Sequence, residues 1–347
     1  MIILSIDTSA DETSVAITSG RKTIASVQFS QIPIHKNYGG IYPILAKREH
    51  QAKIVPVIDH TLRKARTEIS QIDAFAVTFG PGLPPALEVG VQKAKELALT
   101  YKKPLIPVDH IEGHIYSAFV QNRNGNPARE MKFPCLALVI SGGHTELVLM
   151  NDHIDYSIIG TTLDDAAGEA LDKAARMLGF QYPGGPIIEQ FALKGNIKAI
   201  PFPIPMLKSG TLDFSYSGIK TAFKYMLEKM SPEEKIAALP DLCATFQNSV
   251  FESIKQKFRK AILKYNPKII SVGGGVSSNV LLRKNLREIA KECNKSIYFP
   301  PYKYLNTDNA AMIGVAAFYK YEKGIYLTDP TKLDRIPRAN LDSWIDA

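Results

Sequence analysis

Two histidines stand four residues apart in the run His110-Ile-Glu-Gly-His114. Residues i and i+4 of a helix lie one above the other, so the two imidazoles are spaced to bind one metal ion. Zinc peptidases carry a general-base glutamate directly after the first histidine. Glu112 comes one position later, about 100° further round the helix, which disfavours a peptidase. Two interpretations stay open: a metal site, or two ordinary histidines on a half-buried helix.

Three turns rich in small residues follow apolar runs that are typical of strands. They are Asp7-Thr8-Ser9, Ser141-Gly142-Gly143 and Gly273-Gly274-Gly275. Such turns direct backbone N–H groups toward one point, and glycine lets a phosphate approach closely. We expect a nucleotide-type ligand, and three purely structural turns are the alternative.

Acidic residues near these turns have two interpretations each. Asp11 and Glu12 lie in the first turn, where they either face a bound phosphate or are solvated turn residues. Asp308 precedes an apolar helix, which predicts either an N-cap or a carboxylate metal ligand from the far end of the chain.

Three further positions are candidates for contacts with a nucleoside. Asp172 lies one helical turn after Gly168 and is placed to reach a ribose hydroxyl. Gly185, in the rigid turn Pro183-Gly-Gly-Pro186, leaves room for the edge of a sugar. Asn279 follows the third glycine turn at a helix start, where a simple N-cap is the alternative.

Alternating strands and helices must position these residues, as in an α/β protein. The expected strands are 2–7, 14–18, 135–140, 146–150 and 268–272. The expected helices are 43–65, interrupted at Pro56, then 85–102, 164–178 ending at Gly179, 218–229, 242–264 and 277–293. The strand–turn–strand unit recurs after some 130 positions, which predicts an internal duplication with two similar lobes facing a cleft.

Composition limits the class of protein. The chain of 347 residues is 45% hydrophobic and 22% charged, which is ordinary for a globular protein. No apolar run approaches the roughly 20 residues of a membrane span, and Met1–Asp7 leads straight into a strand without a targeting segment. Three scattered cysteines fit a reducing compartment, so we expect a cytoplasmic location. The net charge of +8 favours polyanionic partners.

The motifs, taken in order, resemble those of the bacterial tRNA N(6)-adenosine threonylcarbamoyltransferases, formerly described as O-sialoglycoprotein endopeptidases. The resemblance covers nearly the whole chain. The matching motifs are Asp7-Thr-Ser-Ala-Asp11-Glu12, Gly39-Gly-Ile-Tyr-Pro43, Arg48-Glu-His50, Gly80-Pro-Gly-Leu83, His110-Ile-Glu-Gly-His114, Ser141-Gly-Gly-His144, Asp164-Asp-Ala-Ala-Gly168-Glu-Ala-Leu-Asp172, Tyr182-Pro-Gly-Gly185, Asp213-Phe-Ser-Tyr-Ser-Gly218, Gly273-Gly-Gly-Val-Ser-Ser-Asn279 and Thr307-Asp308-Asn309. Ala10, where relatives commonly have Cys, and Pro84-Pro85 depart from the pattern.

The resemblance implies a duplicated actin/hexokinase-like fold of two lobes (the ASKHA, ribonuclease H-like class) with a central cleft. It implies one divalent metal ion, iron or zinc, on His110, His114 and Asp308, and it matches Asp11 and Glu12 to acidic positions needed for activity. The positions implied to bind the donor, L-threonylcarbamoyl-adenylate, are Val139, Ile140, Ser141, Gly142, Gly143, Asp172, Gly185 and Asn279.

The implied N-terminal lobe is 1–108, completed by the C-terminal helix 310–347, and the C-terminal lobe is 109–309. The implied reaction modifies adenosine 37 of tRNA and releases AMP. Implied partners are tRNA, a non-catalytic paralogous subunit and a small ATPase subunit, with no membrane. The alternatives are an actin-type ATPase or kinase, which shares the turns but does not need the three metal ligands, a metalloprotease, and a scaffold paralogue, which would have lost the ligand set.

Overall fold

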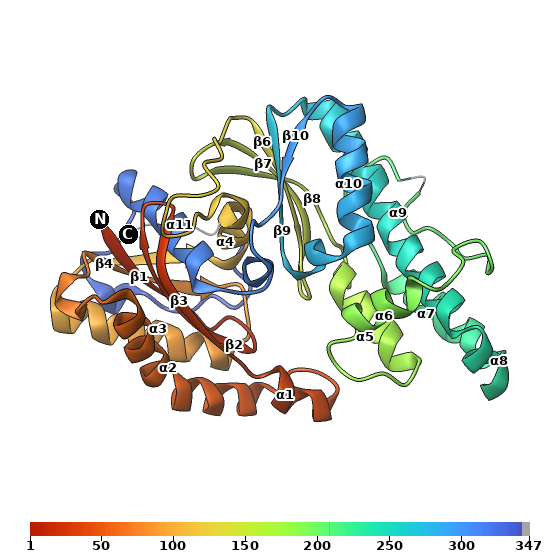
Figure 1. Ribbon diagram of the computed structural model, residues 1–347, viewed down its shortest axis with the longest axis horizontal. Coiled ribbons are helices and arrows are strands. Elements are labelled where there is room, and N and C mark those ends of the chain that lie inside the picture. The colour runs from red at the N-terminus through yellow and green to blue at the C-terminus, as the bar shows by residue number, and fades with distance from the viewer. Residues whose placement is uncertain (208, 342–347) are drawn as a thin grey trace. The chain divides into compact units, whose positions relative to one another are not determined.

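The structure is a computed structural model that describes residues 1–207 and 209–341. The chain forms two compact units (Figure 1). The first consists of Met1–Met131, Asp152–Tyr156 and Tyr298–Ala347, and the second of Lys132–Asn151 and Ser157–Ile297. Residues 342–347, which the predicted N-terminal lobe includes, lie outside the described residues.

The first unit is built on a five-stranded sheet. Its strands are β1 (Ile2–Asp7), β2 (Glu12–Ser19), β3 (Lys22–Ser30), β4 (Ala74–Gly80) and β5 (Leu105–Asp109), and its helices are α1 (Ile32–His35), α2 (Pro43–Ala65), α3 (Pro84–Tyr101), α4 (His110–Tyr116) and α11 (Ala310–Glu322). The strand order is β3-β2-β1-β4-β5. β1 pairs antiparallel with β2 and parallel with β4, and β4 pairs parallel with β5.

Helices cover both faces of this sheet (Figure 1). α2 and α3 pack together on one face, where Ile6, Val77, Ile54 and Val91 belong to one buried hydrophobic cluster. α11 packs on β1 and β2. Apolar side chains on a sheet and on one stripe of each helix must be buried against each other, which accounts for these layers.

The second unit repeats the same topology. Its strands are β6 (Cys135–Ile140), β7 (Thr145–Asp152), β8 (Asp155–Thr161), β9 (Ile269–Gly273) and β10 (Ser296–Tyr298), and its helices are α5 (Ala167–Met177), α6 (Gly185–Ala192), α7 (Ser217–Glu228), α8 (Pro232–Ala237), α9 (Leu239–Tyr265) and α10 (Val280–Glu292). The strand order is β10-β9-β6-β7-β8, with β6 antiparallel to β7 and parallel to β9. The predicted duplication and α/β class are confirmed.

Two predictions differ from the structure. α2 runs without a break through Pro56, because Pro56 lies on the exposed side of the helix and the carbonyl that loses its N–H partner is open to water. The first unit includes residues 109–131 and 298–309, which the sequence assigned to the second lobe. α4 packs on α11 and so stays with the first sheet.

The third glycine turn starts a 3-10 helix, Gly275–Ser278, so that α10 begins at Val280, after the predicted start. Among the described residues, none of the helices has both the length and the apolar character of a membrane span.

Candidate metal centre and glycine-rich turns

The helix that carries both histidines begins where β5 ends. Asp109 is its N-cap, and Oδ1 of Asp109 accepts hydrogen bonds from the backbone N–H of Ile111 (2.7 Å) and Glu112 (3.3 Å). Oε2 of Glu112 in turn accepts from the backbone N–H of Asp109 at 3.3 Å. This reciprocal capping box stabilises the start of α4, where His110 lies.

His110 and His114 converge on Asp308. Each Nε2 atom lies 3.3 Å from Oδ1 of Asp308, and one donor atom from each residue lies within 4.8 Å of the others. Asp308 is delivered by the start of α11, whose N-cap is Asn309. The N-cap interpretation of Asp308 is therefore wrong, because the following residue caps the helix and Asp308 faces the histidines.

The donor set fits a divalent metal ion. The imidazole of His114 is fully buried, and its Nδ1 forms no hydrogen bond within residues 1–207 and 209–341. Nε2 shares one carboxylate oxygen with His110. Two imidazole nitrogens and one carboxylate oxygen form the set that binds zinc or iron(II) with positions left open.

Charge on the three ligands is strongly coupled. Burial acts to lower the pKa of His110, but Asp308, Asp7 and Asp109 raise it to about 9. Burial lowers the pKa of His114, while His110 and His114 hold the pKa of Asp308 below its ordinary value against the effect of burial. The carboxylate of Asp308 therefore favours the charged form of His110 and opposes the effect of burial on the pKa of His114.

Asp7 is a residue of this centre that the sequence assigned only to a turn. Its carboxylate is fully buried, Oδ1 accepts from the backbone N–H of Ser9, and Oδ2 lies 3.9 Å from Nδ1 of His110. A carboxylate behind a ligating histidine orients the imidazole. β1 and β5 both run parallel to β4, so their carboxyl ends meet at one edge of the sheet. No signal for this contact was present in the sequence, because neither β4 nor β5 was predicted.

The first turn is acidic and enclosed. Asp11 lies in it, Glu12 is the first residue of β2, and both are buried rather than solvated. Burial raises the pKa of Glu12 to about 7, and the hydrogen bond from Ser30 (2.8 Å) only partly opposes this shift. His50 holds the turn, since Nε2 donates to the carbonyl of Ala10 at 3.0 Å.

The corresponding turn of the second unit is open. Oγ of Ser141 accepts from the backbone N–H groups of Gly143 (3.3 Å) and His144 (3.1 Å). Gly142 and Gly143 are exposed, neither has a left-handed φ, and a Cβ on either would meet nothing within 4 Å. The fold does not require glycine there, whereas a ligand approaching the backbone would.

Further residues predicted to bind the donor lie in β6, in α5 and at the start of α6. Val139 and Ile140 are fully buried in β6, so only their backbone is available to a ligand. Oδ1 of Asp172 accepts from Gly184 N (2.7 Å) and Gly185 N (3.0 Å), and burial raises the pKa of Asp172. Gly185 leaves open space where a side chain would lie.

Asn279 is the N-cap of α10, as the alternative interpretation predicted. Its Oδ1 accepts from Leu282 N at 3.1 Å, and its Nδ2 donates to Oε1 of Gln247 at 2.9 Å. The metal ligands, Asp11 and Glu12 belong to the first unit, and all the predicted donor-binding residues belong to the second.

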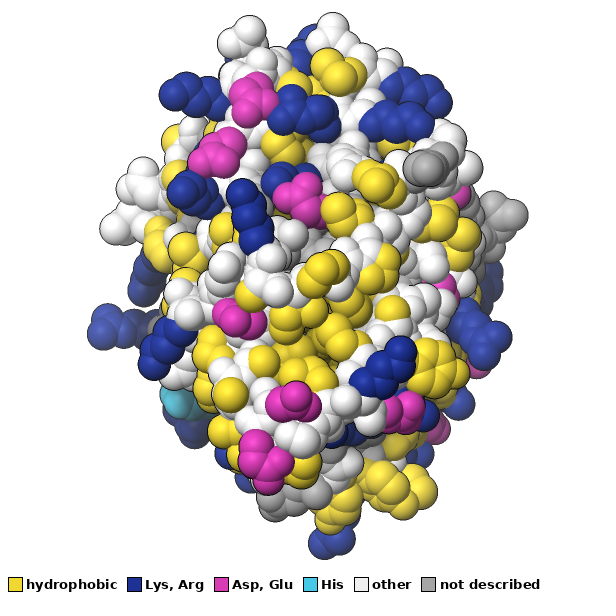
Figure 2. Space-filling view, turned by 90° about the vertical axis from the view of Figure 1, so that its right-hand side faces the viewer, with side chains coloured by type: hydrophobic (Ala, Val, Ile, Leu, Met, Phe, Trp, Pro, Cys, Tyr) yellow, Lys and Arg dark blue, Asp and Glu magenta, His cyan; other side chains and the backbone are white. Residues whose placement is uncertain are grey.

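One face of the molecule shows a cluster of hydrophobic side chains, with Lys, Arg, Asp and Glu dispersed around it (Figure 2). The positive charges on that face form no single stripe (Figure 2). On this face the charge does not identify a surface for a polyanion (Figure 2).

Comparison with known proteins gives consistent results. Residues 22–315 match the family model described as tRNA N6-adenosine threonylcarbamoyltransferase. Proteins of that name from Endomicrobium trichonymphae (47% identical, covering 99% of both chains) and Bacillus subtilis strain 168 (46% identical, covering 94% of this chain and 92% of the relative) are similar to this chain.

Two solved structures share the fold. HypF of T. kodakarensis superposes with a TM-score of 0.63 at 14% identity, covering 96% of this chain and 49% of HypF. The (R)-2-hydroxyglutaryl-CoA dehydratase component A of Acidaminococcus fermentans gives a TM-score of 0.54 at 14% identity, covering 93% of this chain and 98% of that chain. The fold is the duplicated actin/hexokinase-like type.

Proposed function

Because the chain belongs to the tRNA N6-adenosine threonylcarbamoyltransferase family, we propose that it transfers a threonylcarbamoyl group to the exocyclic amine of adenosine 37 in tRNA. The donor is L-threonylcarbamoyl-adenylate, and the substrates are tRNAs that read codons beginning with A. The observation that carries this proposal is the convergence of His110, His114 and Asp308 in a chain that matches the family over nearly its full length.

In this reaction a carbon–nitrogen bond to the adenosine amine forms and a carbon–oxygen bond to the phosphate breaks. The adenosine amine nitrogen attacks the carbamoyl carbon, the bond from that carbon to the phosphate oxygen breaks, and AMP leaves with the electron pair. The amine loses one proton. The protein must therefore bind the anionic leaving group, position a weakly nucleophilic amine and accept a proton.

The first unit supplies the metal ligands and the proton acceptor. His110, His114 and Asp308 would hold one divalent ion per subunit, iron or zinc, which would supply Lewis-acid chemistry at the carbamoyl group. Asp11 or Glu12 receives the proton of the amine through water. A carboxyl group whose pKa is about 7 suits this task near neutral pH, because both of its protonation states are populated.

The second unit binds the donor. The backbone of Val139, Ile140, Ser141, Gly142 and Gly143 accommodates the phosphate and carbamoyl groups, since the exposed glycines leave space there. Asp172 and Gly185 contact the nucleoside. Asn279, as the N-cap of α10, completes the donor-binding surface. We assign tRNA, a non-catalytic paralogous subunit and a small ATPase subunit as partners.

The test is reconstitution. The purified protein is incubated with threonine, bicarbonate, ATP, an adenylate-forming enzyme, unmodified tRNA and the two partner subunits, and the digested tRNA is examined for threonylcarbamoyladenosine by mass spectrometry. We expect the modified nucleoside with the wild-type protein and none with His110→Ala. Its absence with every other component verified active contradicts the transferase proposal. Hydrolysis of ATP by this chain alone would favour the ATPase or kinase alternative.

A further inference from the structure

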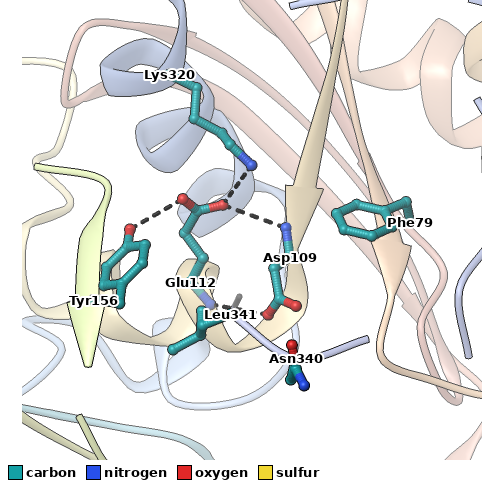
Figure 3. Close-up of a pocket in the computed structure, with 7 residues that line it drawn as sticks. All are labelled: Phe79, Asp109, Glu112, Tyr156, Lys320, Asn340 and Leu341. Atoms are coloured by element: carbon teal, nitrogen blue, oxygen red, sulfur yellow. Dashed lines mark hydrogen bonds and ion pairs between the residues drawn. The ribbon is translucent and has the colours of Figure 1, made fainter. Parts of the chain in front are cut away.

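A buried ion pair lies beside the metal centre and takes no part in the proposed chemistry. Nζ of Lys320, near the end of α11, lies 2.9 Å from Oε2 of Glu112 on α4, and both side chains are only 1% exposed. Figure 3 shows Glu112 between Lys320 and Tyr156, pointing toward both. Glu112 is therefore shielded from water, which removes it as a general base.

Each end of the pair has further hydrogen bonds. Oε1 of Glu112 accepts from the hydroxyl of Tyr156 at 3.0 Å, and Oε2 also accepts from the backbone N–H of Asp109. Nζ of Lys320 donates to the carbonyl of Pro107 at 2.7 Å. A buried ion pair stabilises a defined geometry only when such hydrogen bonds accompany it, and here they reach β5, α4 and α11.

The space around the pair is nearly filled. A cavity of about 10 Å³ is lined by Phe79, Asp109, Glu112, Tyr156, Lys320, Asn340 and Leu341 (Figure 3). That volume holds about one water molecule at most. Bulk solvent therefore has no room to surround the ion pair.

Glu112 and the histidines lie on opposite sides of α4. Glu112 is two positions from each histidine, which corresponds to roughly 160–200° of rotation about the helix axis. The contact between the helices is close, because a Cβ on Gly113 would lie 2.7 Å from Cδ1 of Ile313. α11 thus holds one side of α4 through Asp308 and the other through Lys320.

The start of α11 is also fixed. The backbone N–H of Ala310 donates to Oγ of Ser14 at 2.9 Å, and its carbonyl accepts from Oγ of Ser5 at 2.6 Å. Asp308 is therefore anchored to the sheet, and rotation of α4 is the remaining freedom that would separate the histidines from it.

We propose that Lys320 is a positioning residue for the metal ligands, and that its pair with Glu112 sets the rotation of α4 that brings His110 and His114 to Asp308. Apolar side chains of similar volume often replace a buried ion pair without loss of stability, so stability alone does not account for the charges. A requirement for one fixed rotation of α4 does account for the charges, since a charge pair with three hydrogen-bonded partners has one favourable geometry. This inference rests on the proposed metal site.

The test measures metal binding by the full-length protein, with Co²⁺ as the spectroscopic probe and Zn²⁺ as competitor. Lys320→Met leaves Glu112 without its counter-charge, and we expect Co²⁺ affinity to fall about 10–100-fold, as for other residues that orient ligands, with a changed ligand-field spectrum. Lys320→Met/Glu112→Gln removes both charges while glutamine still accepts from Tyr156. We expect the double variant to recover partly and to stay several-fold weaker than wild type.

Lys323→Met is the matched control, because Lys323 is the C-cap residue of the same helix but pairs with Asp152 at the surface. It should bind Co²⁺ as wild type does. Wild-type affinity and spectrum in folded Lys320→Met overturn the inference, whatever happens to thermal stability. If that variant does not fold, wild-type binding by the double variant overturns it instead.

His110→Ala separates this inference from the metal site itself. If wild type and His110→Ala bind Co²⁺ equally, the metal site fails and the positioning role with it. If only His110→Ala loses the ion while both Lys320 variants keep it, the positioning role alone fails.

Discussion

The two units share one strand order and differ at the turn after the central strand. In each, the central strand pairs antiparallel with the next strand and parallel with a later one. After β1 the turn contains Asp7 and Asp11 and is buried, while after β6 it contains Gly142 and Gly143 and is exposed. The same topology therefore carries a buried acidic turn in the first unit and an exposed glycine turn in the second.

Electrostatics explains the difference. Burial raises the cost of ionising a carboxyl group in this turn, as the raised pKa of Glu12 shows, and the nearby Asp11 adds a smaller contribution. That cost falls when a cation is close. Exposed glycines offer backbone N–H groups and no competing side chain, which suits an anion. We therefore assign the cation to the first unit and the phosphate of the donor to the second.

The largest effect is expected when a metal ligand is removed. His110→Ala should lose the bound ion and reduce transfer more than about 100-fold, since even outer partners of metal ligands contribute 10–100-fold. Affinity for AMP, which reports on the second unit, should stay within about twofold of wild type. Elemental analysis, the transfer assay and calorimetry measure the three quantities.

The matched control is His60→Ala, an exposed histidine of α2 in the same unit, which should change none of them. Loss of AMP binding together with the metal in His110→Ala would break the division of labour between the two turns.

The reciprocal change fills the glycine turn. Gly143→Val should raise the KM for the donor about 10-fold or more, because branched carbons occupy space that the ligand needs, and metal content should not change. The variant should fold, since a Cβ at Gly143 meets nothing within 4 Å.

Gly210→Val is the control, because Gly210 is also open in the same unit but is not assigned to the donor. A normal KM in Gly143→Val, or an equal rise in Gly210→Val, would contradict the assignment of the turn.

Local patterns in the sequence predicted much of both units. The spacing of His110 and His114 predicts one helix face, and small residues after apolar runs predict the turns at β1 and β6. Five strands were not predicted: β3, β4, β5, β8 and β10. β4 lacks alternating polarity, and Pro107 within β5 lowers its strand character. The predicted strands include the central strand of each sheet, whereas all four edge strands, β3, β5, β8 and β10, were missed.

Long-range contacts were not predictable from local pattern. Lys320 follows Glu112 by about two hundred positions, and nothing near Lys320 indicates that it is buried. The orientation of Asp7 toward His110 depends on β1 and β5 lying parallel in one sheet, which only the strand order establishes. Asp308 was recognised through the family resemblance, since its local pattern equally predicted an N-cap.

A smaller effect comes from pH. If Glu12 accepts the proton, transfer should rise with pH up to about 7 and fall about tenfold for each pH unit below it. Glu12→Gln should remove this limb from the profile of kcat/KM. An unchanged profile in Glu12→Gln would assign the proton acceptor elsewhere.

Stability gives an independent readout of the same group. The pKa of folded Glu12 is raised from 4.5 to about 7, so its contribution to stability is complete below pH 4.5 and is lost as the pH rises through 7. At pH 8 Glu12→Gln should therefore be more stable than wild type, by on the order of 2 kcal/mol, as measured by urea unfolding. Equal stability would show that burial does not set this pKa.

The smallest effects compare one helix cap from each unit. Asn279 caps α10 and Asn309 caps α11, each through Oδ1 to a backbone N–H, at 3.1 and 3.0 Å. Alanine at either position should lower the free energy of unfolding in urea by about 1 kcal/mol.

The two variants should differ in ligand binding. Asn309→Ala should weaken Co²⁺ binding, because Asp308 adjoins the lost cap, and Asn279→Ala should instead raise the KM for the donor. Both shifts should be less than about fivefold, since each variant loses one helix-cap hydrogen bond and a bond of this kind contributes about 1 kcal/mol. If both variants change both quantities equally, the two turns do not act separately, and the contrast between an acidic and a glycine turn has no functional meaning.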